Sequence, residues 1–275
     1  MRRGLGTRWV ALLVVLVGGA VLATPPASAA AVRSPMEGLF DVGGYRLYLR
    51  CRGTGTPTVV MDASLGADSS TWAPIETLLA RYTRVCVYDR AGVGRSDPAP
   101  VPRTSQDMVD DLQTLLRVAG VPGPYVLVGH SLGGLNVQLF AREDGGRNVV
   151  GVVLVDATPA EFPAVVMQAG FPVPSPEENP EGVDLFASGA EVLAAPPFPP
   201  VPLVVLTHGV AILPPPLEVL WQQLQAAQAQ LSPLGRLVVA RRSGHFIHED
   251  EPRLVLRTII QVVNEARRPP RPAAA

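Results

Sequence analysis

One segment organises the whole chain: Tyr125-Val126-Leu127-Val128-Gly129-His130-Ser131-Leu132-Gly133-Gly134. An apolar run leads into a serine between two glycines, and apolar residues at helical spacing follow. This pattern predicts a strand, a sharp turn with Ser131 at its tip, and a helix. The spacing of Gly129, Ser131 and Gly133 is typical of a nucleophile elbow, where a Cβ at either glycine would collide with the neighbouring strand or helix. An ordinary glycine-rich turn between a strand and a helix has the same local pattern, so the context has to decide.

The proposed turn has a chemical use. It would expose the Ser131 Oγ beside the first turn of a helix, where backbone amides have no partner and can bind an anion. A serine hydroxyl is a weak nucleophile, however, and needs an adjacent base to take its proton. The remaining sequence must therefore supply a base and a group that orients it.

The first 30 residues have the features of an export signal. Arg2, Arg3 and Arg8 form a basic region, an apolar or small run of 15 residues follows, and Ala27-Ser28-Ala29 fits the cleavage pattern. The run is shorter than the ~20 residues that a transmembrane helix needs. We expect a signal peptide over residues 1–30 and a protein that is secreted or in the cell envelope. An uncleaved N-terminal anchor is the alternative.

Residues 31–275 are long enough for one large domain with a sizeable core. Cleavage would remove three arginines and change the formal charge from −1 to about −4. No basic patch indicates nucleic-acid binding. We expect no stable membrane span after the signal is cleaved.

Short apolar segments alternate with amphipathic ones along this domain. A hairpin is expected around Gly43-Gly44, and an amphipathic helix over residues 105–119. Further helices are expected at 72–82, from Pro214 and from Pro252. The other expected strands are 58–61, 84–88, 125–128, 149–155, 203–206 and 236–240. Continuous apolar strands between amphipathic helices indicate a mostly parallel sheet covered on both faces.

Residues 157–201 differ from the rest because they are rich in proline and acidic residues. An insertion of this length between two strands is either a functional lid or a poorly ordered connector. Its apolar residues are suited to the roof of a pocket; they are Phe162, Val165, Val166, Met167, Phe171 and Phe186.

Four motifs occur in the order known from the α/β-hydrolase family. They are Asp62-Ala63-Ser64-Leu65-Gly66, the turn Asp89–Ser96, the segment around Ser131, and Ser243-Gly244-His245. Over residues 37–267 the chain therefore resembles an α/β-hydrolase. The resemblance implies an α/β fold with an eight-stranded, mostly parallel sheet, helices on both faces and a short lid after the sixth strand. It also implies that the turn Asp89–Ser96 braces the catalytic face.

The candidate bases are the four histidines. His245 follows the last expected strand, at the edge of the sheet where Ser131 also emerges, and the family's base lies at this position. His130 is expected to pack locally with its side chain turned away from the catalytic face. His248 is expected to line the rim or to cap the next helix. His208 is the fourth candidate.

The acid departs from the family's common pattern. That pattern has an Asp or Glu in the loop after the seventh strand, but Thr207–Pro216 contains neither. The family's other placement is the end of the sixth strand, which is Asp156 here. Asp156 would hold the tautomer of His245 and stabilise its imidazolium. A structural role for Asp156, Glu218 as the acid, and a dyad without an acid are the alternatives.

The resemblance also implies an oxyanion hole made by two backbone amides. One belongs to Leu132, after the nucleophile. The other falls on Leu65, although Ser64 stands where the family usually has glycine; Leu65 as a simple pocket wall is the alternative.

The fold implied by the resemblance places the two cysteines together. Cys51 ends the second strand, Cys86 lies near the start of the fourth, and these strands run antiparallel. We expect a disulfide between them, as suits an exported protein; two buried free thiols are the alternative.

We therefore expect a secreted serine hydrolase that cleaves an ester or related small acyl compound through an acyl-enzyme on Ser131. No metal or organic cofactor is called for. A serine nucleophile argues against epoxide hydrolysis and dehalogenation, for which the family uses aspartate. Peptidase, thioesterase and lactonase activities are open within the class. A catalytically weak ligand-binding protein on the same fold is the alternative of a different kind.

Overall fold

In the computed structural model, the described residues are Met1 and 36–268. Apart from Met1, the expected signal peptide lies outside them. The elements from Met36 onward belong to one compact unit. Among the helices of residues 36–268, none is both long and apolar enough to cross a membrane.

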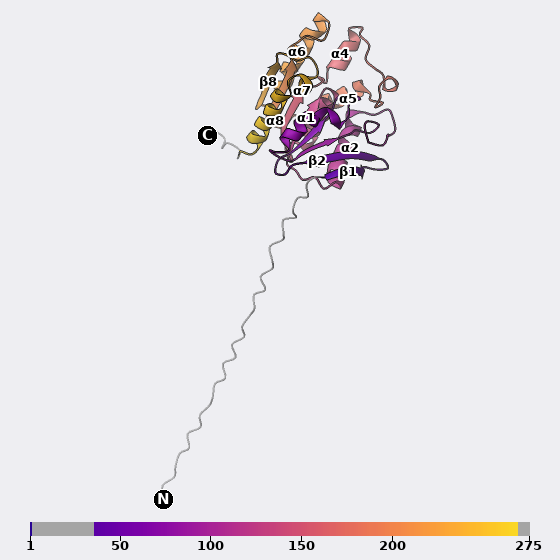
Figure 1. The fold of residues 1–275 in the computed structure, drawn as a ribbon. Helices are drawn as coiled ribbons and strands as arrows, with labels where there is room; N and C mark the ends of the chain where they lie inside the picture. Colours follow the sequence, from indigo (N-terminus) through magenta and orange to yellow (C-terminus); the bar gives the residue numbers. More distant parts are fainter. Residues whose placement is uncertain (2–35, 269–275) are drawn as a thin grey trace. The chain divides into compact units, whose positions relative to one another are not determined.

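The described chain forms a sheet of eight strands in the order β1-β2-β4-β3-β5-β6-β7-β8. Figure 1 shows β1 and β2 on one side of this unit and β8 on the other. β2 is antiparallel to β1 and to β4, and every other neighbouring pair is parallel. The predicted fold class is therefore confirmed. The strands are β1 Met36–Asp41, β2 Arg46–Arg52, β3 Thr58–Asp62, β4 Val85–Tyr88, β5 Tyr125–His130, β6 Val149–Val155, β7 Leu203–His208 and β8 Gly235–Ala240.

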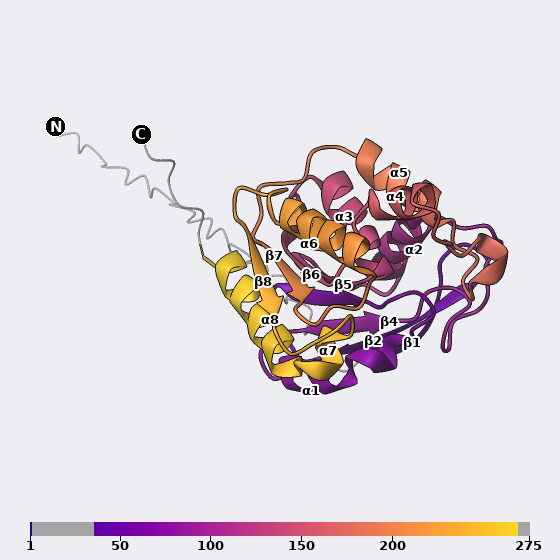
Figure 2. The same ribbon diagram turned by 90° about the horizontal axis from the view of Figure 1, so that it is seen from above.

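Helices cover both faces of this sheet (Figure 2). α1 and α8 lie on one face, and α2, α3 and α6 lie on the other. The helices and 3-10 turns are η1 Ser69–Trp72, α1 Ala73–Leu79, α2 Ser105–Val118, α3 Leu132–Asp144, α4 Phe162–Gln168, η2 Pro176–Glu178, α5 Leu185–Ala194, α6 Pro215–Ala229, α7 Ile247–Asp250 and α8 Pro252–Ala266.

The central strands are apolar on both sides because each face packs against helices. Val126 and Val128 belong to the apolar layer under α1 and α8, whereas Leu127 belongs to the layer under α2 and α3. All three are fully buried. The apolar run before the elbow therefore anchors Ser131 at the end of a central, rigid strand.

The structure contains the predicted disulfide. Cys51 and Cys86 lie directly opposite each other in the antiparallel β2–β4 pair, and their sulfur atoms are 2.03 Å apart. Both residues are buried. Closing a loop of 35 residues stabilises the folded state by about 4 kcal/mol in the chain-entropy description.

Residues 157–201 contain α4, η2 and α5 rather than an additional strand of the sheet. The side chain of Asp184 caps α5, because it accepts hydrogen bonds from the amides of Phe186 and Ala187, both at 2.9 Å. α5 packs against α2 and α3, and α4 packs against α5 and α6. The insertion thus lies over the helical layer that follows the elbow.

Candidate active site

Ser131 lies between β5 and α3 in a backbone conformation that L-residues rarely adopt, with φ 52° and ψ −117°. A Cβ on Gly129 would lie 2.3 Å from the carbonyl oxygen of Gly133 in α3. A Cβ on Gly133 would lie 2.5 Å from the carbonyl oxygen of Asp62, at the end of β3. The predicted collision with the adjoining helix and strand is therefore confirmed at both glycines.

Asp156 is the second strained residue. Within residues 36–268, Ser131 and Asp156 are the two non-glycine residues with positive φ, at 52° and 42°. Such conformations cost about 1–3 kcal/mol each, and they concentrate at functional sites. Backbone hydrogen bonds hold both residues: Ser131 N donates to the Val155 carbonyl at 3.3 Å, and Asp156 N donates to the Leu206 carbonyl at 2.7 Å. The two strained turns thus occupy neighbouring strand ends.

The structure brings Asp156 and His245 together. His245 Nδ1 lies 2.7 Å from Asp156 Oδ2. The Asp156 side chain is fully buried, whereas that of His245 is 24% exposed. Burial raises the pKa of the Asp156 carboxyl, but hydrogen bonds from His208 and His245 outweigh burial and hold the pKa at about 2. Asp156 is therefore an ionised acceptor for His245 at neutral pH.

His245 also lies beside the elbow. Its ring centroid is 4.6 Å from that of His130, the neighbour of Ser131, and the Nε2 of His130 lies 2.9 Å from the His245 carbonyl oxygen. In the described chain, the Ser131 Oγ has one side-chain partner, Thr158 Oγ1 at 3.5 Å, and makes no hydrogen bond to His245. Bonds between a nucleophile and its base are often long without substrate and tighten only in the complex.

His130 is buried and packs locally, as expected, but its ring lies against His245 rather than away from the catalytic face. His248 is also buried; its Nε2 lies 2.8 Å from Thr71 Oγ1 and its ring packs on Trp72. Burial lowers the pKa of both imidazoles, that of His248 to about 4. The expectation that His248 lines the rim or caps the next helix is therefore wrong, since it is buried within α7 and Glu251 is the N-cap of α8. Both rings are neutral groups packed beside His245.

His208 is the residue that sequence reasoning left without a role. It ends β7, is fully buried, and contacts both oxygens of Asp156 through Nδ1 at 2.9 and 2.8 Å. Its Nε2 lies 2.9 Å from Glu218 Oε1. Glu218 is separated from His245 by His208 and Asp156, so it is not placed to orient His245 directly. The sequence did offer one signal for a role of His208: it ends the seventh strand, and the family's acid usually lies in the loop that follows.

A backbone hydrogen bond ties the loop that carries Leu65 to the elbow, where Leu132 directly follows Ser131. Gly133 N donates to the Ala63 carbonyl at 3.1 Å, which ties the loop after β3 to the first turn of α3. In the described residues, the amides of Leu65 and Leu132 have no hydrogen-bond acceptor. Ser64 has no positive φ, so serine in place of glycine introduces no backbone strain there.

Arg90 braces this loop. From the sequence, a bracing role was expected for the turn Asp89–Ser96 as a whole, without a named residue. Its guanidinium contacts the carboxylate of Asp62 and donates to the carbonyls of Ala63 and Ser64 at 2.7 and 2.6 Å. It also forms a two-point ion pair with Glu181, with both bonds at 2.7 Å. Glu181 belongs to the 157–201 insertion, so one buried cation joins the insertion to the loop carrying Leu65.

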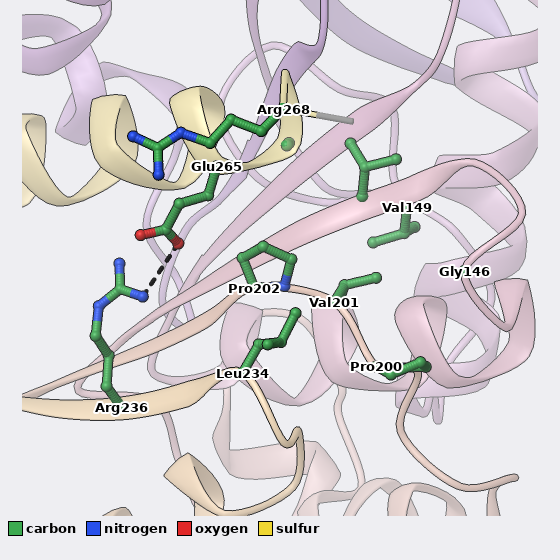
Figure 3. Close-up of a pocket in the computed structure, with 11 residues that line it drawn as sticks. Gly146, Val149, Pro200, Val201, Pro202, Leu234, Arg236, Glu265 and Arg268 are labelled. Carbon is green, nitrogen blue, oxygen red and sulfur yellow. Dashed lines mark hydrogen bonds and ion pairs between the residues drawn. The ribbon is translucent and has the colours of Figure 1, made fainter. Parts of the chain in front are cut away.

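A groove away from these residues is lined mainly by apolar side chains. A cavity of about 790 Å³ opens near the amino ends of β6 and β8 (Figure 3). Val149, Val201 and Leu234 line it, together with the ion pair between Arg236 and Glu265 at 3.1 Å. None of the predicted site residues lines this groove. In the described chain, no group of His, Cys, Asp or Glu side chains could hold a metal ion.

Comparisons with known proteins agree with this architecture. The model of the alpha/beta hydrolase family matches residues 53–258. The chain is 28% identical over 239 residues to the uncharacterized protein YqjL of Bacillus subtilis (strain 168). This alignment covers 82% of this chain and 92% of that protein.

Two solved structures are similar in fold. An esterase from Thermogutta terrifontis has a TM-score of 0.63 and 22% identity, covering 86% of this chain and 100% of that one. The enol-lactonase from Burkholderia xenovorans LB400 has a TM-score of 0.62 and 22% identity, covering 83% of this chain and 100% of that one. At these identities the likeness concerns the fold.

Proposed function

The chain belongs to the alpha/beta hydrolase family, and from this premise we propose that it is a serine hydrolase of small acyl compounds, with esters as the first class of substrate. The observation that carries the proposal is the 2.7 Å contact of His245 Nδ1 with Asp156. Because Nδ1 is held by Asp156, the Nε2 of His245 can act as the base. The ring of His245 packs on His130, the residue before Ser131.

The proposed reaction has two acyl-transfer steps. Ser131 Oγ attacks the substrate carbonyl while His245 Nε2 takes the hydroxyl proton, and His245 then gives this proton to the leaving alcohol. A water molecule, activated by His245, hydrolyses the acyl-enzyme. Asp156 stays ionised throughout and stabilises the imidazolium of His245. The amides of Leu65 and Leu132 stabilise the negative charge on the carbonyl oxygen.

The 157–201 insertion is proposed to act as a lid over this site. Phe162 at the start of α4 packs edge-on against Trp221 of α6, with ring centroids 4.8 Å apart. Trp221 in turn donates from Nε1 to Asp156 at 3.2 Å. An apolar wall contributed by the insertion therefore adjoins the acid of the proposed triad. Export through the signal peptide over residues 1–30 remains part of the proposal.

A ligand-binding protein without turnover was the competing hypothesis, because no acid follows β7. The contact of Asp156 with His245 supports an enzyme instead, since it supplies the missing acid from β6. Thioesterase, lactonase and peptidase activities are alternatives within the same chemistry. A panel of p-nitrophenyl esters of increasing acyl length, run beside a thioester, a lactone and a peptide substrate, ranks them by kcat/KM.

Labelling with a fluorophosphonate tests the nucleophile. The purified protein should be labelled and should hydrolyse short p-nitrophenyl esters, and Ser131→Ala should abolish labelling and lower kcat by on the order of 10⁶-fold. Ser232→Ala is the matched control, because the Ser232 hydroxyl is buried and donates to the Val201 carbonyl, away from the elbow. Failure of the wild-type protein to label or turn over any ester would favour the ligand-binding alternative.

A further inference from the structure

His208 stands between two carboxylates. Its Nδ1 contacts Asp156 at 2.8 and 2.9 Å, and its Nε2 contacts Glu218 at 2.9 Å. A neutral imidazole donates from one ring nitrogen and accepts at the other, whereas an imidazolium donates from both. We propose that His208 is a buried imidazolium that positions Asp156 and extends the triad to Glu218.

The partners of the two carboxylates leave the extra proton on His208. Asp156 also receives the amide of His208 at 3.1 Å and Trp221 Nε1 at 3.2 Å. Glu218 receives Gln222 Nε2 at 3.0 Å and the amides of Ile212 and Leu213 at 3.1 and 3.3 Å. A carboxylate surrounded by donors stays ionised. Neither acid therefore has a suitable acceptor for a proton of its own.

The charged groups around His208 also favour the protonated form of its imidazole. Burial lowers the pKa of His208, but hydrogen bonds and the charges of Asp156 and Glu218 outweigh burial and raise it. Burial raises the pKa of Glu218, but hydrogen bonds from Gln222, the Ile212 amide and His208 outweigh burial and lower it. The remaining titratable group nearby is His245, on the far side of Asp156. The aromatic ring of Trp221 stacks on His208 at 5.9 Å.

This arrangement gives His208 a definite part in the proposed reaction. Because Nδ1 reaches both oxygens of Asp156, it fixes the plane of the carboxylate and directs Oδ2 at His245 Nδ1. His208 touches Asp156 rather than the reacting atoms, so it is a positioning residue. Loss of its proton would leave the Nε2 lone pair facing Glu218, and the rearrangement would lower turnover at high pH.

The proton on His208 can be observed without any substrate. The chain has four histidines, so ¹⁵N-histidine NMR can assign each ring with single variants. The expected result is that both nitrogens of His208 carry protons at pH 7, whereas the buried His248 is neutral. One unprotonated nitrogen on His208 at pH 7 would overturn the proposal. This outcome is independent of the proposed function, which fails instead if Ser131 is not labelled.

Kinetics test the positioning role, which rests on the proposed function. Glu218→Gln removes one of the two charges, so the alkaline limb of the kcat–pH profile should move to lower pH by at least about one unit, because the loss of a nearby opposite charge shifts a pKa by about 1–3 units. His208→Gln should lower kcat by roughly 10- to 100-fold with little change in KM, as expected when an outer hydrogen-bond partner is lost.

The control for Glu218→Gln is Glu265→Gln, the same chemical change in the ion pair with Arg236 at the opposite edge of the sheet. It should leave the alkaline limb in place. An unshifted limb in Glu218→Gln would show that His208 does not set the alkaline limit and would overturn its role in turnover. Thermal unfolding of each variant separates this outcome from a loss of folded protein.

Discussion

Two buried aspartates stand at the two ends of β6 and illustrate how the edges of the sheet differ. Asp144, before the strand, accepts hydrogen bonds from the amides of Asn148 and Val149, both at 2.8 Å. Asp156, after the strand, accepts from His208, His245 and Trp221, which belong to elements far along the chain. Asp144 closes a local turn, whereas Asp156 joins β6, β7, α6 and the loop after β8.

The groove and the candidate catalytic residues also lie at different edges of the sheet. The groove of about 790 Å³ in Figure 3 lies at the amino edge, and its charged groups are Arg268 and the partly exposed ion pair of Arg236 with Glu265. The carboxyl edge carries the strained residues Ser131 and Asp156 and the histidines around them. Strain together with buried, paired charge therefore marks the carboxyl edge as the candidate site.

The largest expected effect follows from exchanging one aspartate at a time. Asp156→Asn keeps the shape of the side chain but no longer holds His245 in the productive tautomer, so kcat should fall by about 10⁴-fold. Ester hydrolysis under saturating substrate measures the loss. Asp144→Asn is the matched control: it weakens a local turn and should leave kcat of the folded enzyme unchanged.

Turnover that survives Asp156→Asn would mean that the triad proposed above is wrong, even though the elbow stands. Equal losses of kcat in the two variants would mean that Asp144 at the amino edge matters as much for turnover as Asp156 at the carboxyl edge. Circular dichroism spectra of both proteins ensure that folded enzymes are compared.

The disulfide provides the next largest effect, and it should concern stability alone. Cys51–Cys86 joins β2 to the first half of β4, and neither cysteine belongs to the proposed triad or oxyanion hole. The double variant Cys51→Ala with Cys86→Ala should lower the free energy of unfolding by about 4 kcal/mol, measured by urea denaturation. Its kcat should stay within about twofold of wild type. A much larger fall in kcat would show that the β2–β4 pair influences the site.

Local patterns were enough to predict the elbow, the strands and the helices that cover the sheet, but not α4 and α5 of the 157–201 insertion. The collision distances at Gly129 and Gly133 depend on a turn whose geometry is encoded within five residues. The Cys51–Cys86 pairing followed from the strand order that the resemblance implied. These features depend on chain-local rules or on a shared topology, and both can be read from a single sequence.

The histidines show where such reasoning ends. The roles of His208, His130 and His248 are set by their partners, which lie up to 177 residues away along the chain. Whether an imidazole bridges two carboxylates or packs as a neutral ring is decided by side-chain geometry across four loops. The link from Arg90 to Glu181 of the insertion was unpredictable for the same reason.

The smallest effect concerns how Asp156 responds to acid. Its pKa is lowered from 3.8 to about 2, so its ionised form stabilises the folded state by roughly 2 kcal/mol, at about 1.4 kcal/mol per unit. Because the folded pKa is the lower one, this contribution is complete above about pH 4 and is lost as the pH falls through about 2. The difference in unfolding free energy between wild type and Asp156→Asn should therefore shrink by about this amount between pH 5 and pH 2. A difference that stays constant over this range would mean that Asp156 does not carry its charge in the folded state, and the contrast with Asp144 would lose its electrostatic basis.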